Sequence, residues 1–256
     1  MNKKYYFSDF TEDNYKHLLE IAVENYQFTG FDLNKISTSN DRLILWRHDV
    51  DYSLNRAFAL SEIEHSMGVK TTYFIHLHSS MYNPFEKQQT ALINKIIKNG
   101  HSIGLHFDFA FYNSLGNTAN LQGAVDLADF ERKILQNFLG VNIDCVSFHN
   151  PEASKVLDID GDYYAGMVNA YAKSIKDKFK YCSDSNGYWR FDRLEDVLKG
   201  DYANVQVLTH PTWWTKNIMS PYDRIVRCVE GRKNKNMMDY NNFLKDCGRE
   251  NVGKPE

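Results

Sequence analysis

Short apolar segments alternate with amphipathic segments over most of the chain. Residues 43–46, 71–75 and 102–105 consist mainly of aliphatic, aromatic and β-branched side chains, which is typical of buried strands. Between them apolar residues recur at helical spacing, and Ser53 and Gly68 stand where a helix over residues 53–67 would begin and end. The pattern continues with predicted strands at 144–148, 179–182 and 205–208, and predicted helices at 11–23, 88–98, 120–138, 193–198 and from 222 onward.

Strands that alternate with helices in this way indicate βαβ units. Such units build a mainly parallel sheet, because each helix returns the chain to the same end of the sheet. We find no internal repeat, low-complexity tract or linker that would divide the sequence. We therefore predict an α/β fold with a closed or nearly closed sheet. We expect one domain over residues 1–256, with residues 1–40 as a helical N-terminal extension packed on the barrel.

Seven ionisable residues fall at the carboxyl ends of four predicted strands. In parallel α/β sheets these ends form one face, and active sites are built there. Each residue alone has an ordinary structural explanation, but seven on one face indicate a functional site. They are His48, Asp49, Asp51, His106, Asp108, His149 and His210.

Asp49 and Asp51 form the first candidate pair. Residues two apart on a strand point to the same side, so both carboxylates can face one cavity. Two carboxylates this close resist ionising together unless a cation lies between them, and a bound metal would provide that charge. The competing interpretation is a solvated turn or a helix cap, because Asp51 lies just before the predicted helix that begins near Ser53.

Three histidines extend the candidate site. His106 ends a strand with Asp108 two residues later, and neutral imidazole commonly binds transition metals. His149 and His210 each stand next to a proline or one residue from it on a strand-end loop, which suits a general acid or base. The adjacent tryptophans at 213 and 214 are equally compatible with a wall for a sugar ring and with the core.

Composition narrows the class of protein. The formal net charge of −3 argues against a nucleic-acid-binding surface, which usually carries a basic excess. The 4 cysteines are scattered without a CxxC pair, which fits free thiols better than a disulfide framework or a zinc knuckle. No apolar stretch reaches the length of a membrane span, and the first residues lack the apolar core of a signal peptide. We therefore expect a cytoplasmic protein.

Five motifs in this order resemble the NodB-like polysaccharide deacetylases, carbohydrate esterase family four. They are RHDVD, TTYFI, GHSIGLHFD, SFHNP and LTHP, and together they span about residues 43–214. The first and third are fairly specific, and the others add support by their order. The likeness is nearest to a cytoplasmic-type branch of that superfamily. It implies a distorted (β/α) barrel of about seven strands.

The resemblance also implies roles for individual residues. Asp49 matches the catalytic base and His210 the general acid, while Asp51 and His106 match metal ligands. His149, Asp184 and Trp189 match further family positions that bind substrate or orient the base. From their places beside the predicted site, we add His48 and Trp213 as candidates for the same roles.

Two positions depart from the family pattern. The second metal-binding histidine of the family stands four residues after the first, where this chain has Ala110. Because catalytic zinc usually has three protein ligands, we expect Asp108, or otherwise His149, to complete the site. The family's arginine beside the base falls at His149, which could orient Asp49 instead. The expected cofactor is a divalent metal, zinc first, with cobalt, manganese and iron also compatible.

The expected activity is metal-dependent removal of an N-acyl group, acetyl first, from an amino sugar in surface polysaccharide biosynthesis. The substrate would be a small-molecule or lipid-linked carbohydrate. Two alternatives stay open, namely hydrolysis of a non-sugar amide bond and a degenerate carbohydrate-binding module without activity. Ala110 favours the degenerate module, whereas retention of Asp49, Asp51 and His210 counts against it.

Overall fold

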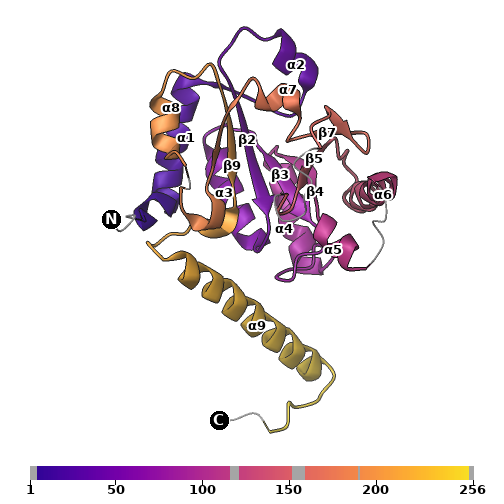
Figure 1. The fold of residues 1–256 in the computed structure, drawn as a ribbon. Coiled ribbons are helices and arrows are strands. Elements are labelled where there is room, and N and C mark those ends of the chain that lie inside the picture. The colour runs from indigo at the N-terminus through magenta and orange to yellow at the C-terminus, as the bar shows by residue number, and fades with distance from the viewer. Residues whose placement is uncertain (1–4, 116–120, 152–158, 190, 254–256) are drawn as a thin grey trace.

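A curled, mostly parallel sheet forms the centre of the protein (Figure 1). The computed structural model describes residues 5–115, 121–151, 159–189 and 191–253. Strands follow the order β6-β7-β5-β4-β3-β2-β9-β8, with β1 also beside β2, and every pairing is parallel except that of β6 with β7. The strands are β1 (Gln27–Thr29), β2 (Leu43–Val50), β3 (Thr72–His76), β4 (Ser102–Phe107), β5 (Cys145–Phe148), β6 (Tyr163–Tyr164), β7 (Met167–Asn169), β8 (Lys180–Ser183) and β9 (Asn204–Thr209).

Helices connect the strands as the alternation predicted. They are α1 (Glu12–Asn25), α2 (Leu33–Thr38), α3 (Leu54–Ser66), α4 (Lys87–Lys98), α5 (Phe109–Ser114), α6 (Leu121–Leu139), α7 (Lys173–Lys176), α8 (Leu194–Lys199) and α9 (Pro221–Asp246). Ser53 caps α3 by accepting a hydrogen bond from the Arg56 amide, and Gly68 follows the helix with a φ of 71°. The predicted α/β fold with a barrel-like sheet is confirmed. The sheet is a half-barrel, because its end strands, β6 and β8, do not pair with each other in the described chain.

Strand β2 is buried along its whole length and separates two apolar clusters. Ile44 and Trp46 pack on the outer side with α1 and α8, whereas Leu43 and Leu45 face an inner cluster that includes Ile36 of α2 and residues of α7. Side chains alternate along a strand, so Arg47 and Asp49 continue the inner side. The inner apolar cluster therefore fills the amino end of the half-barrel, and polar groups occupy its carboxyl end.

Several short elements had no clear signal in the sequence. Residues 27–29, which we expected within a helical extension, instead form β1 and pair with the first residues of β2. The same residues of β2 pair with β9 on one edge of the strand. On the other edge, β1 pairs with the first part of β2 and β3 with the last part. A segment as short as β1 carries too few residues to show a period.

Helix α9 leaves the body of the protein, and its carboxyl-terminal half projects away from the sheet (Figure 1). Ser220 caps its first turn and Pro221 occupies the first helical position. Within the described residues, no helix is both long and apolar enough to cross a membrane.

Candidate metal centre

The register of the sheet brings the candidate residues together at its carboxyl end. His76 on β3 pairs with His106 on β4, and His106 pairs with Ser147 on β5, so the three lie in one row across the strands. Asp51 directly follows β2, beside the end of β3. His149 directly follows β5, and its amide donates to the carbonyl of Phe107 at the end of β4.

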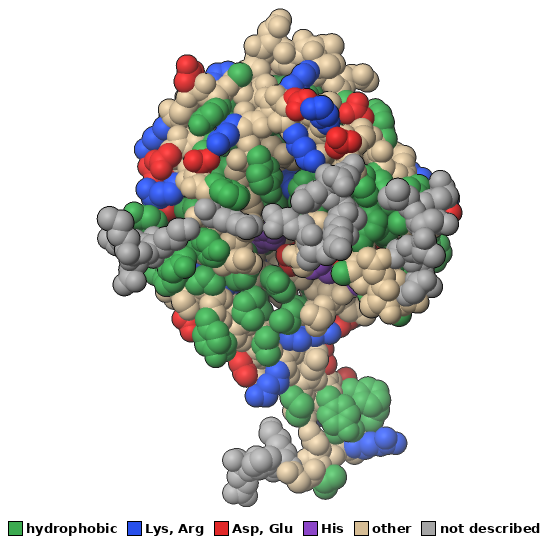
Figure 2. Space-filling model, viewed as in Figure 1, with side chains coloured by type: hydrophobic (Ala, Val, Ile, Leu, Met, Phe, Trp, Pro, Cys, Tyr) green, Lys and Arg blue, Asp and Glu red, His purple; other side chains and the backbone are tan. Residues whose placement is uncertain are grey.

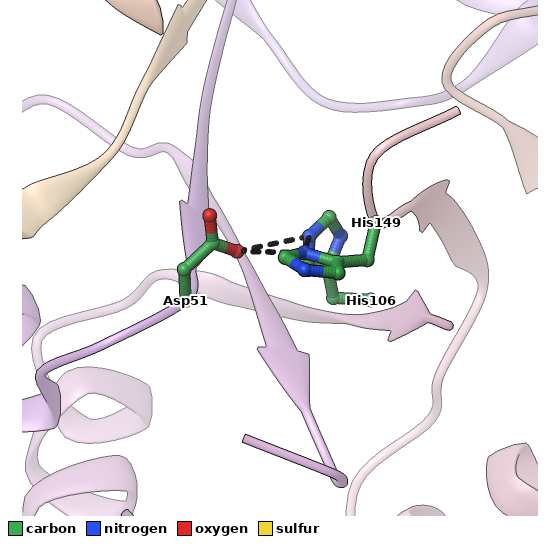
Figure 3. A group of neighbouring side chains, drawn as sticks. All are labelled: Asp51, His106 and His149. Atoms are coloured by element: carbon green, nitrogen blue, oxygen red, sulfur yellow. Dashed lines mark hydrogen bonds and ion pairs between the residues drawn. The ribbon is translucent and has the colours of Figure 1, made fainter. Parts of the chain in front are cut away.

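Three side chains place one ligand atom each at the corners of a small triangle (Figure 3). Asp51 Oδ1 lies 3.1 Å from His106 Nε2 and 3.3 Å from His149 Nδ1. The two imidazole nitrogens are 3.3 Å apart. Asp51, His106 and His149 are therefore a group that could hold a metal ion.

The donor set fits a divalent metal in size and chemistry. Nitrogen and oxygen atoms bound tetrahedrally to zinc at about 2.0–2.1 Å lie roughly 3.3 Å from one another, close to the three separations observed. Asp51 Oδ1 is buried and makes no hydrogen bond among the described residues, so its lone pairs are not satisfied by the protein. Burial raises the pKa of Asp51, but the neighbouring imidazoles of His106, His149 and His210 lower it by more, well below its usual range.

Ser147 fixes the tautomer of His106. Its Oγ donates to Asp49 Oδ1 over 3.1 Å, which uses the only hydroxyl hydrogen. The 2.6 Å contact between Ser147 Oγ and His106 Nδ1 must then be donated by Nδ1. Nε2 of His106 is left without a proton and faces Asp51 with its lone pair, as a metal ligand requires. Ser147 thus links Asp49 to the ligand group through two consecutive hydrogen bonds.

Asn150 contacts the outer nitrogen of His149. Its side-chain nitrogen lies 2.8 Å from His149 Nε2, and a turn of the amide would present its oxygen there instead. That orientation places the imidazole proton on Nε2 and leaves Nδ1 free to bind a metal. Asn150 has a φ of 44°, a left-handed conformation that asparagine tolerates better than most residues.

Arg47 lies behind Asp49 on the inner side of β2. Its Nη1 is 3.8 Å from Asp49 Oδ1, and the side chain is completely buried. None of its guanidinium nitrogens makes a hydrogen bond to the described residues, although its carbon lies 4.5 Å from the ring centre of Tyr171. Burial lowers the pKa of Arg47, but the charge of Asp49 and the contributions of Tyr171 and Tyr181 together raise it above its ordinary value, so the cation persists beside the carboxylate.

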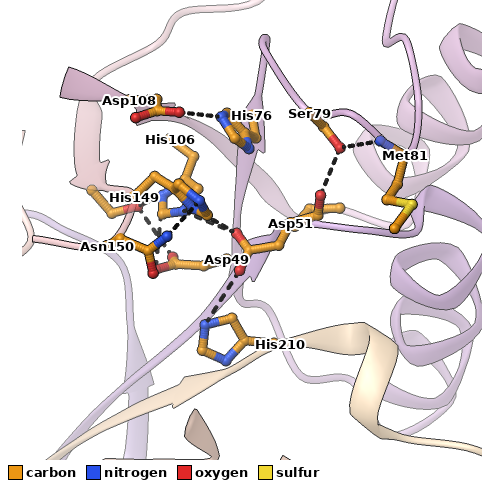
Figure 4. Close-up of polar contacts among 12 residues, drawn as sticks. Asp49, Asp51, His76, Ser79, Met81, His106, Asp108, His149, Asn150 and His210 are labelled. Atoms are coloured by element: carbon orange, nitrogen blue, oxygen red, sulfur yellow. Dashed lines mark hydrogen bonds and ion pairs between the residues drawn. The ribbon is translucent and has the colours of Figure 1, made fainter. Parts of the chain in front are cut away.

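His210 faces the ligand group from the other side (Figure 4). Its Nδ1 is 2.6 Å from Asp184 Oδ1, and its Nε2 is 3.8 Å from Asp51 Oδ2. Asp184 is fully buried and also accepts hydrogen bonds from the His210 amide and from Trp214 Nε1. Burial lowers the pKa of His210, but Asp184 raises it to about 9. The imidazole is therefore held as a proton donor with Nε2 toward the cavity.

A cavity of about 400 Å³ opens onto these groups. Figure 2 shows histidine and acidic side chains at the bottom of a recess near the centre of this face. The walls include Tyr171, Tyr181 and Phe148, and Asp49, Asp51, His106, His149 and His210 all reach the same space. Aromatic walls around a few polar groups are usual for small-molecule sites.

Asp108, our first choice for the third ligand, points elsewhere. Its Oδ1 accepts hydrogen bonds from the amides of Ala110 and Phe111, so it caps the start of α5. Its Oδ2 lies 3.4 Å from His76 Nε2, and His76 stacks on His149 with ring centres 4.5 Å apart. The geometry therefore favours the other candidate, His149, as the third ligand. His149 accordingly faces Asp51, and Arg47 occupies the place beside Asp49 that we had expected His149 to take.

Three further predicted site residues do not line the cavity. His48 lies on the outer side of β2, where its Nε2 is 2.7 Å from Glu64, because neighbouring residues of a strand point to opposite sides. Trp189 donates a hydrogen bond to Asp9, and Trp213 packs in the outer apolar cluster.

The sequence reasoning missed the contributions of Ser147, Arg47 and His76. Arg47 could have been found, because it is two residues before Asp49 and shares its side of the strand. Ser147 and His76 depend on the register between strands, which the sequence pattern does not provide.

Comparisons with known proteins give structural matches only. No protein-family model and no curated protein matches the chain. An esterase of carbohydrate esterase family 4 (CE4) from Streptococcus mutans matches with a TM-score of 0.47 and 13% identity over 89% of this chain and 91% of that chain. A family 4 carbohydrate esterase from Bacillus anthracis matches with a TM-score of 0.41 and 13% identity over 85% and 86%.

A CE4 family pseudoenzyme from Bacillus anthracis matches as well, with a TM-score of 0.42 and 15% identity over 77% of this chain. This match covers 62% of the pseudoenzyme, so the chain spans less than two thirds of that protein's length. A deacetylase from Streptococcus pyogenes also matches, with a TM-score of 0.42 and 12% identity over 83% of this chain and 84% of that chain. The structural matches therefore lie among the CE4, or NodB-like, deacetylases and esterases and a pseudoenzyme of that family, at low sequence identity.

Proposed function

We propose that the protein is a metal-dependent hydrolase that removes an N-acyl group, acetyl first, from an amino sugar. The observation that carries the proposal is the arrangement around one cavity of three ligand atoms, Asp49 and His210. A carboxylate base and a protonated imidazole on either side of a metal site are the groups that amide hydrolysis needs.

Asp51, His106 and His149 would hold the ion. When bound, a divalent metal polarises the carbonyl and lowers the pKa of water to about 7. Asp49 accepts the proton of the attacking water, while Ser147 and Arg47 hold its carboxylate in place. The bond between the acyl carbon and nitrogen then breaks.

His210 completes the reaction on the leaving group. Its Nε2 faces the cavity and delivers a proton to the departing amine, because Nδ1 is engaged by Asp184. The products are a carboxylic acid and a free amino sugar. The aromatic walls formed by Tyr171 and Tyr181 support a sugar as substrate. We further propose that the substrate is a small-molecule or lipid-linked carbohydrate. It would be made in the cytoplasm for surface polysaccharide synthesis.

The test combines metal analysis with an assay of acetate release from N-acetylated amino sugars. Asp49→Asn should retain stoichiometric metal and lose about 10²–10⁴-fold in kcat, as is usual for removal of an acid–base group. Asp51→Asn should lose both the metal and turnover. Stoichiometric metal in Asp51→Asn would refute the ligand assignment.

Metal and sugar binding without acetate release in the unaltered protein would instead indicate the degenerate binding module. Ala110 favoured this alternative because it stands where the family has its second metal-binding histidine. In the structure Ala110 is exposed on α5, and His149 supplies the third potential ligand atom instead.

A further inference from the structure

A second cavity, of about 370 Å³, lies between the body and the first half of α9. Its walls come from the start of α3, from residues 81–82 and 89, and from α9. Four of the lining side chains are basic, and none is acidic. The basic residues are Arg56, Arg227, Arg232 and Lys235.

Three of these cations have carboxylate partners outside the cavity wall. Arg56 pairs with Glu12 at 2.5 Å, Arg232 pairs with Glu86, and Lys235 pairs with Asp239. These pairs leave one basic residue to be accounted for.

Arg227 is the remaining cation. No carboxylate pairs with it in the described chain, and its Nη2 is buried without a hydrogen bond there. Burying a guanidinium nitrogen without a hydrogen-bond acceptor destabilises the folded protein. This indicates that an anion from outside the protein accepts the missing hydrogen bond.

Two neighbouring groups show the same excess of positive charge. Burial and, to a smaller extent, the charge of Arg227 lower the pKa of Arg224 to about 10. Burial also lowers the pKa of Arg56. Glu12 raises this pKa, whereas the charge of Arg227 lowers it.

Gln89 adds an unpartnered polar group to the wall. Its side chain is 7% exposed, and its Oε1 makes no hydrogen bond within the described residues. A glutamine amide can also turn its NH2 group toward an anion. Arg227 and Gln89 thus line one cavity from two different helices, and each carries a buried polar atom without a hydrogen-bond partner among the described residues.

The cavity is adjacent to the metal centre. Asp51 lines the first cavity, and the next residue, Tyr52, lines the second. Ser79 donates to the Asp51 carbonyl and accepts from the amide of Met81, which also lines the second cavity. Figure 4 shows Ser79 and Met81 on the side of Asp51 away from His106 and His149. One substrate could therefore extend past Asp51 into both cavities.

We propose that this second cavity binds the diphosphate group of a phosphorylated amino-sugar substrate, whose N-acyl group reaches the metal centre. The inference rests on the proposed function for the sugar part. Phosphate oxygens are acceptors that match the planar fork of arginine, and a diphosphate offers enough of them for several cationic side chains.

The test is calorimetric titration of the metal-free 256-residue chain with inorganic pyrophosphate. Arg227→Gln should weaken binding by about tenfold or more, the scale of one charge-assisted contact. Lys233→Gln is the matched control. It makes the same change of charge on the same helix, but Lys233 is exposed, pairs with Glu230 and does not line the cavity. The control should stay within about twofold of the unaltered protein.

Arg227→Lys provides a second variant that keeps the charge and should retain most of the affinity. Absence of saturable binding, or equal loss in Arg227→Gln and Lys233→Gln, would overturn the proposal. Asp51→Asn should bind pyrophosphate normally, so a failure of the metal site is distinguishable from a failure of the anion site.

Uridine diphosphate and farnesyl diphosphate then distinguish the sources of the group. If uridine diphosphate binds more tightly than pyrophosphate, the carrier is a nucleotide. If farnesyl diphosphate binds more tightly, the carrier is a prenyl chain. Equal binding of all three supports the diphosphate site alone.

Discussion

At the scale of single residues, Ser147 connects Asp49, the proposed base, to His106, a proposed metal ligand. Its hydroxyl donates to Asp49 and accepts from His106 Nδ1, so the tautomer of the ligand depends on it. Ser147→Ala should weaken metal affinity by about 10–100-fold, the usual effect of losing a partner that orients a ligand. Competition with a fluorescent chelator measures the affinity. Ser102→Ala, at an exposed position where β4 begins, is the control and should bind metal normally.

The identity of the third ligand is also a question about single residues. His149→Ala should reduce metal affinity by at least about 100-fold and barely change the stability of the metal-free protein. Asp108→Ala should leave the metal affinity nearly unchanged. It should lower the stability of the metal-free protein, because Asp108 caps α5 and loss of a cap costs about 1 kcal/mol. Chelator competition and urea unfolding of both variants give the comparison. Normal metal affinity in His149→Ala would return Asp108 to consideration.

The sequence predicted the strand-end residues well but not their directions. Asp49, Asp51 and His106 came together as expected because alternation along a strand and the shared carboxyl face are local rules. The choice between Asp108 and His149 depended on how the chain turns after β4 and β5. Asp108 begins a short helix there, and its carboxylate is drawn to the free amides of that helix.

At the scale of elements, a buried carboxylate joins the helices to the outer side of the sheet. Glu64 on α3 accepts hydrogen bonds from Tyr15 on α1 at 2.5 Å and from Tyr73 on β3 at 2.7 Å. His48 on β2 and Thr71 complete the group at 2.7 and 3.0 Å. Four elements are therefore held at one point by a side chain with no exposed surface.

Glu64→Ala should lower the free energy of unfolding by about 3 kcal/mol, because it leaves buried donors and a histidine without their partner. Chemical unfolding of the metal-free protein measures the change. Glu62→Ala, at an exposed position on the same helix, should cost less than about 0.5 kcal/mol. An equal effect of both variants would show that the Glu64 group contributes little.

The same group sets a dependence on pH. Burial raises the pKa of Glu64, but the charge of His48 and the surrounding hydrogen bonds lower it below its ordinary value of 4.5. A carboxyl group with a lowered pKa stabilises the folded state fully above its unfolded value, and that contribution disappears as the pH falls. The difference in stability between the unaltered protein and Glu64→Ala should therefore shrink below about pH 4.5.

The long alternating elements were predictable for the same reason that they are stable. Strands β2, β3, β4 and β9 and helices α1, α3 and α4 occur where apolar periodicity indicated them, because each buries one continuous face. By contrast, β1, β7 and α7, of three or four residues each, depend on the neighbours they pair with or pack against. Such contacts lie far apart in sequence, so local periodicity does not show them.

At the scale of the whole molecule, the proposed metal centre joins three strands that lie apart in sequence. Asp51 follows β2, His106 ends β4 and His149 follows β5, so an ion bound to all three would cross-link the carboxyl end of the half-barrel. The unfolded chain does not hold these ligands together. Metal binding should therefore stabilise the entire fold, by about 2.7 kcal/mol when free metal is 100 times its dissociation constant.

For a chain of this length each kcal/mol raises the midpoint of thermal unfolding by about 2–4 °C, so we expect a rise of about 5–10 °C. Thermal unfolding should be followed with zinc, cobalt and manganese in turn, at several concentrations, against the chelator-treated protein. The rise should grow with the logarithm of metal concentration above saturation, because the stabilisation follows mass action. Asp51→Asn should show no rise at the concentration that saturates the unaltered protein, and Asp108→Ala should show the full rise from a lower starting midpoint. If Asp51→Asn gained as many degrees as the unaltered protein, the stabilising ion would be bound elsewhere, and the centre formed by Asp51, His106 and His149 would not be the metal site.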